Sequence, residues 1–81
     1  MKKSEILDTL AKDYARSHTV YASMEKQAAE FLRQNKMDAY QQMARKAAHR
    51  AGLNHGIRRA AVTLGIDEND FMEAVARHLN K

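Results

Sequence analysis

Residues 4–34 decide the fold of this chain, and their sequence is SEILDTLAKDYARSHTVYASMEKQAAEFLRQ. The stretch contains neither proline nor glycine, so nothing interrupts the hydrogen-bond ladder of an α-helix. At 100° per residue its apolar side chains stay on one face from Ile6 to Leu32, and they also fit a seven-residue repeat. The stretch therefore predicts one helix of about 45 Å, capped by Ser4 and long enough to pack against a partner helix.

A turn and a glycine divide the next part of the sequence. Residues 35–38 predict a short turn, with Asp38 as the N-cap of a second helix that returns antiparallel to the first. At Gly52 the apolar direction changes phase, because a continuous helix would place Leu53 on the same side as charged side chains. We therefore expect this helix to end there, with Asn54 as the N-cap of a third helix.

The last boundary lies at Gly65-Ile66-Asp67. Gly65 suits the left-handed residue that ends a helix, and Asp67 suits the N-cap of the next one. Ile66 and Phe71 occupy the two positions of a hydrophobic staple across that cap. The length of 81 residues allows one domain with a thin core. The prediction is a single all-α domain over residues 1–81, with four helices at about 4–34, 38–51, 54–64 and 67–79.

The segment Arg59-Ala60-Ala61-Val62-Thr63-Leu64-Gly65-Ile66 resembles the corresponding part of a Fis-type helix-turn-helix. The resemblance covers residues 57–80 and implies DNA binding, with the last helix in the major groove. That helix departs from the family at its start, where Asp67, Glu68 and Asp70 would repel phosphates. A glycine turn between two ordinary antiparallel helices is the alternative interpretation.

Positive charge is concentrated in the middle of the chain. Residues 33–59 contain seven basic side chains and one acidic side chain, in a chain of net charge +4. This pattern predicts a basic surface that binds the backbone of a nucleic acid or an acidic protein, and a solvated amphipathic face is the alternative. The predicted binding residues are Arg45, Lys46, His49, Arg50, Arg58 and Arg59.

A polar row interrupts the apolar face of the first helix. Tyr14, His18, Tyr21 and Glu25 follow one another at helical spacing along it. We expect a hydrogen-bonded layer that sets the register of a helix pair, in keeping with a homodimer built on this helix. A small titratable pocket is the alternative function of these residues.

Several kinds of chemistry lack their residues in this sequence. The chain has no cysteine, and its four histidines do not have the spacing of a helical metal site, so neither a metal nor a cofactor is expected. No serine has an evident base and no glycine-rich phosphate loop occurs, so we do not expect an enzyme. We expect a cytoplasmic regulatory protein without a membrane segment that binds nucleic acid, or alternatively a protein-interaction module such as an adaptor or phage-type inhibitor.

Overall fold

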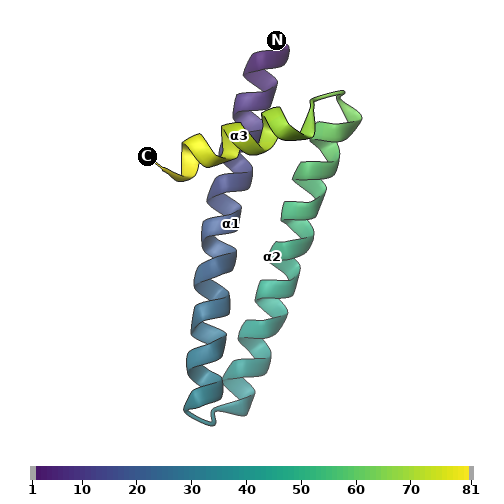
Figure 1. The fold of residues 1–81 in the computed structure, drawn as a ribbon. Coiled ribbons are helices and arrows are strands. Elements are labelled where there is room, and N and C mark those ends of the chain that lie inside the picture. The colour runs from purple at the N-terminus through teal and green to yellow at the C-terminus, as the bar shows by residue number, and fades with distance from the viewer. Residues whose placement is uncertain (1, 81) are drawn as a thin grey trace.

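The computed structural model describes residues 2–80 and contains three helices, α1 (Lys3–Arg33), α2 (Met37–Thr63) and α3 (Glu68–Leu79). The first two form a long antiparallel hairpin, and α3 crosses α1 near its N-terminal end (Figure 1). The molecule is elongated, with extents of 49 × 25 × 18 Å. The predicted all-α class is therefore confirmed, and the long first helix begins and ends within one residue of its predicted bounds.

The prediction of four helices is wrong, because the expected second and third helices are one continuous helix. Gly52 does not end a helix, and Asn54 is not an N-cap but a buried residue in the middle of α2. A glycine inside a helix costs about 1 kcal/mol relative to alanine, which packing against a neighbouring helix can offset. Ala47, Asn54 and Ala61 are buried at a spacing of seven residues, so one seam against α1 runs across the glycine.

The predicted break rested on the assumption that the larger apolar residues near Gly52 face inward. The structure instead leaves Leu53 and Leu64 about half exposed, while small residues form the seam. Close packing of two helices favours small side chains at the contact, and this preference outweighed hydrophobic size. The apolar phase of the large residues was therefore a misleading guide to the inward face of α2.

The predicted caps at the starts of α1 and α2 are also wrong. Lys2 and Lys36 occupy the two N-cap positions, and Ser4 and Asp38 lie inside the first turns. An acidic residue in the first turn still complements the helix dipole. The turn between the helices depends on Asn35, whose φ of 59° lets its amide and that of Lys36 bond to the last carbonyls of α1.

The predicted boundary before the last helix is confirmed in its local chemistry. Gly65 has a φ of 78°, and the amides of Gly65 and Ile66 bond to the carbonyls of Val62 and Ala61. This pair of bonds is a Schellman motif, which satisfies carbonyls that the helix end leaves free. The carboxylate of Asp67 then accepts a hydrogen bond of 3.1 Å from the amide of Asp70. The turn and the start of α3 are thus specified by adjacent residues.

The core is concentrated at the end of the hairpin that α3 covers. Phe71 is 1% exposed and packs edge-on against Tyr14, with ring centroids 5.6 Å apart. In the other half of the hairpin, only Ala28 and Ala47 are buried apolar residues among those described. The core cluster consists of Ala11, Ala15, Ala61, Ile66, Phe71, Ala74 and Val75. Stability therefore depends mainly on the contact between α3 and the hairpin.

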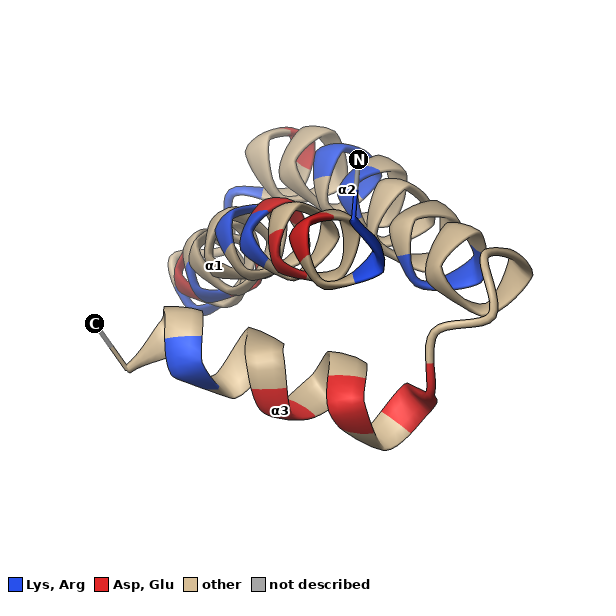
Figure 2. Ribbon diagram, turned by 90° about the horizontal axis from the view of Figure 1, so that it is seen from above, with Lys and Arg blue, Asp and Glu red and all other residues tan. Residues whose placement is uncertain are grey.

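The structure contains the turn of the predicted helix-turn-helix-like pair, but the two helices that the turn joins pack only slightly on each other. α3 packs mainly against α1, and its contact with α2 is slight. In a helix-turn-helix the two joined helices pack on each other and present the second to DNA. Acidic residues lie along the first half of α3, and a basic residue lies near its end (Figure 2). This polarity complements the helix dipole and supports the stability of α3.

Candidate functional site

Three of the six predicted basic residues form a row on the outer side of α2. Arg45, His49 and Arg59 are exposed and point away from α1, opposite the buried seam of that helix. Between His49 and Arg59 the same side carries Gly52 and Gly56, where an added Cβ would meet nothing within 4 Å. We call Arg45, His49 and Arg59 the outer basic row. At the centre of this row the helix backbone is open to solvent at the two glycines.

The other three predicted residues point in different directions. Arg50 is half-buried and Lys46 lies on the same edge of α2, and both line hollows along the seam with α1. Arg58 lies on the opposite edge and forms an ion pair with Glu68 of α3. The hydrogen bond that Arg58 donates to the carboxylate of Glu68 is the main reason why the pKa of Arg58 is raised. Because α2 is continuous, the six residues lie around the helix and do not share one face.

The predicted polar row lies where α1 meets α3 and α2. The ring of Tyr14 lies 6.2 Å from that of His18, and His18 lies 6.3 Å from Tyr21. The hydroxyl of Tyr21 donates a hydrogen bond to the carboxylate of Glu25. This hydrogen bond is the main reason why the pKa of the Tyr21 phenol is raised above its usual value. The structure thus brings all four predicted residues together as one chain of neighbours on α1.

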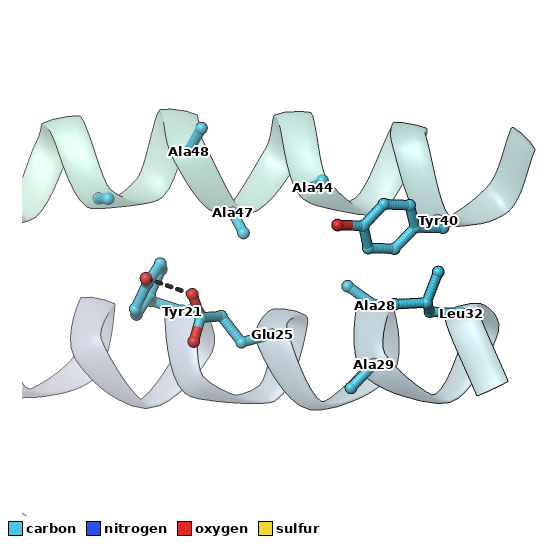
Figure 3. Close-up of a pocket in the computed structure, with 10 residues that line it drawn as sticks. Tyr21, Glu25, Ala28, Ala29, Leu32, Tyr40, Ala44, Ala47 and Ala48 are labelled. Atoms are coloured by element: carbon cyan, nitrogen blue, oxygen red, sulfur yellow. Dashed lines mark hydrogen bonds between the residues drawn. The ribbon is translucent and has the colours of Figure 1, made fainter. Parts of the chain in front are cut away.

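A groove of about 420 Å³ continues from this row into the uncovered half of the hairpin. Tyr21 and Glu25 lie at one end and Tyr40 at the other, with the hydroxyl of Tyr40 directed along the groove (Figure 3). Alanines from both helices form most of the remaining wall. Glu25 is the single charged residue that lines it. The groove offers apolar contact, two phenol groups and one carboxylate.

The opposite side of the hairpin carries residues that the sequence did not single out. Arg16 and Ser17 of α1 line a hollow together with Arg50 of α2. Ser17 is 7% exposed, and its hydroxyl oxygen has no hydrogen-bond partner. The only sequence signal was a serine at a core position of the seven-residue repeat. Recognising Arg16 required the antiparallel pairing of the two helices, because Arg50 is far from it in the chain.

Within residues 2–80, no group of three or more histidine or acidic side chains stands close enough to hold a metal ion. None of the described helices is both long enough and apolar enough to cross a bilayer.

No family model, curated protein or solved structure matches this chain. The resemblance of residues 57–80 to the Fis-type motif thus has no support beyond the local turn sequence. The surfaces on which a binding function can rest are the outer basic row, the groove and the hollows of the hairpin.

Proposed function

We propose that this chain is a small cytoplasmic, non-enzymatic regulatory protein that binds duplex nucleic acid through phosphate contacts along the outer basic row. The observation that carries the proposal is the exposed side of α2, where no acidic residue occurs between residues 39 and 63. Phosphate contacts by Arg and Lys supply most of the affinity of nonspecific nucleic-acid binding. Apart from Asp38 in the first turn of α2, the acidic residues lie on α1 and at the cap and first half of α3 (Figure 2).

The length of the outer basic row suits contact with several phosphates. At about 1.5 Å per residue, Arg45 and Arg59 are about 21 Å apart along the helix axis. A DNA strand carries one phosphate per roughly 3.4 Å of duplex axis, so the row spans about six base pairs. The open positions at Gly52 and Gly56 let the duplex approach the helix between the two arginines. Lys46, exposed at the edge of this surface, adds a third permanent cation.

A homodimer paired through α1 is the second part of the proposal. His18 and Glu25 of the polar row are exposed, so their hydrogen-bonding groups are accessible to a second copy. Two outer basic rows in one assembly would double the phosphate contacts and steepen the salt dependence of binding. Light scattering over a range of protein concentrations checks this part. A monomer at high concentration would refute pairing through α1.

The test of nucleic-acid binding is fluorescence anisotropy with a labelled 20-base-pair duplex across a salt series. With about three phosphate contacts per chain, the slope of log affinity against log salt is about −2.7, or an approximately 40-fold loss between 50 and 200 mM. The double variant Arg45→Gln, Arg59→Gln leaves about one contact, and its slope should fall to about −0.9. Arg77→Gln on α3 is the matched control and should keep the original slope. Absence of binding at low salt, or an unchanged slope in the double variant, would contradict the proposal.

A further inference from the structure

The side of the hairpin opposite α3 carries a trough between α1 and α2. α3 lies on the side of Tyr14 and Arg58, which it contacts through Phe71 and Glu68. On the other side, two hollows of about 360 and 350 Å³ adjoin each other and share Val20. We call these two adjoining hollows the trough. It follows the seam from Asp13 to Gln27 on α1, which is about 21 Å at 1.5 Å per residue.

Apolar side chains line both hollows of the trough, among polar and charged ones. Val20 is 39% exposed and Leu53 is 45% exposed, and both line the trough. Met24 and Met43 line its other end, and Met side chains adapt their shape to different partners. Apolar residues in a continuous row between two helices present the same kind of surface to which α3 binds on the other side. The trough therefore has the contacts expected for a third helix.

Positive charge and an unpaired buried hydroxyl meet at one end of the trough. Arg16 and Arg50 line it from the two helices, and Asp13 is the one acidic residue in its lining. Lys46 lines the other hollow, so the lining of the whole trough contains three cationic side chains and one anionic side chain. Ser17 lines the same hollow as the two arginines, and its buried hydroxyl oxygen has no hydrogen-bond partner. A buried polar group without a partner destabilises the fold, and a bound ligand that accepts its hydrogen bond would remove that penalty.

We propose that the trough binds an acidic amphipathic helix of a partner protein. Its apolar residues pack on Val20 and Leu53, and one carboxylate accepts hydrogen bonds from Arg50, Arg16 and the Ser17 hydroxyl. A carboxylate matches this set because the guanidinium fork donates two parallel hydrogen bonds to it and the hydroxyl donates a third. This inference goes beyond the proposed nucleic-acid binding, and the trough shares with that surface only Lys46, at the edge of α2.

Two other occupants fit the trough less well. A nucleic-acid backbone would gain nothing from the valine, leucine and methionine side chains of the trough, because its surface there is phosphate and sugar. The α3 helix of a second copy is acidic, but its apolar residues Phe71, Ala74 and Val75 are buried within its own chain. A foreign helix with both carboxylates and free apolar side chains satisfies both halves of the trough.

The test uses a labelled synthetic 16-residue peptide that forms an amphipathic helix, with leucines along one face and glutamates beside them. Its dissociation constant for the full chain is measured by fluorescence anisotropy. A second peptide with glutamine at each glutamate position should bind about tenfold more weakly, since charge-assisted hydrogen bonds are about twice as strong as neutral ones. Equal affinities of the two peptides would overturn the proposal.

Protein variants locate the binding surface. Arg50→Gln should weaken the acidic peptide about tenfold, and Arg50→Lys should restore only part of that loss because it keeps the charge without the fork. Arg45→Gln on the outer basic row is the matched control and should change the affinity less than twofold. Ser17→Ala should weaken the peptide while raising the thermal stability of the free chain, which separates a binding role from a structural one. Equal losses in the Arg50 and Arg45 variants would overturn the assignment to the trough.

Two further measurements distinguish the occupants. In methyl spectra, the acidic peptide should shift Met24 and Met43 and leave Met72 of α3 unchanged. A peptide with the sequence of residues 67–80 that bound more tightly than the synthetic one would replace the proposal with self-association. A 20-base-pair duplex could also displace the acidic peptide. If Arg50→Gln abolished both this displacement and duplex binding, the trough would be a nucleic-acid site and the proposal would be overturned.

Discussion

Replacement of Phe71 by alanine tests whether the docking of α3 holds the molecule together. Phe71 is the largest fully buried side chain among the described residues, and it contacts the ring of Tyr14. A buried Phe→Ala change costs about 3–5 kcal/mol, which includes the loss of apolar burial and the cavity that remains. A chain of 81 residues has a total stability of roughly 4–12 kcal/mol, at about 0.05–0.15 kcal/mol per residue. The variant should therefore lose a large part of its folded population.

The measurement is urea unfolding followed by circular dichroism, at several protein concentrations so that association is accounted for. The adjacent Met72→Ala is the matched control, because Met72 is 38% exposed on the same helix and its truncation should cost much less. Each kcal/mol corresponds to a shift of about 4–8 °C in Tm for a domain of this size, so the two variants are separable by heating as well. A loss below about 1 kcal/mol for Phe71→Ala would refute the reasoning that the core lies at the end covered by α3.

Three other predictions concern two glycines, the cap of α3 and the polar row. Gly52→Ala should stabilise the chain by about 0.5–1 kcal/mol in urea unfolding, since its site is open and helical. Gly65→Ala should destabilise the chain by about 1–2 kcal/mol because Gly65 has a positive φ. Destabilisation by Gly52→Ala would argue against a continuous α2. Loss of the N-cap in Asp67→Ala should lower stability by about 0.5–2 kcal/mol, and an unchanged unfolding midpoint would refute the cap. The pKa of Tyr21 is raised in the folded chain by its hydrogen bond to Glu25, so this contribution to stability is present below the ordinary phenol pKa of 10.0 and is lost as pH rises through the higher folded value. Ultraviolet titration should therefore show a late-ionising tyrosine that disappears in Tyr21→Phe, and identical titration curves apart from amplitude would refute it.

The local chemistry of several segments was predictable from the sequence. The helix of residues 4–34 can be predicted without knowing which element packs against it, because a long run of helix-forming residues without proline or glycine favours the helical backbone conformation. The boundary at Gly65 and Asp67 was predictable for a similar reason, since the left-handed residue and the cap act on their own backbone neighbours. The neighbour relations of Tyr14, His18, Tyr21 and Glu25 also follow from helical spacing alone.

Tertiary structure alone decided the continuity of α2 and the arrangement of charge around it. The cost of a helical Gly52 is small, so burial of Ala47, Asn54 and Ala61 against α1 could outweigh it, and no local signal reports that burial. Once α2 is continuous, the rotation of 100° per residue separates the outer basic row from Arg50 and Arg58. The presence of Arg16 and Arg50 in the lining of one hollow likewise depends on the antiparallel register of α1 and α2. The sequence by itself therefore determined the long first helix, the turns near Asn35 and Gly65, and the cap of α3 at Asp67. The packing of α1, α2 and α3 determined which side chains share a surface, because that depends on residues far apart in the chain.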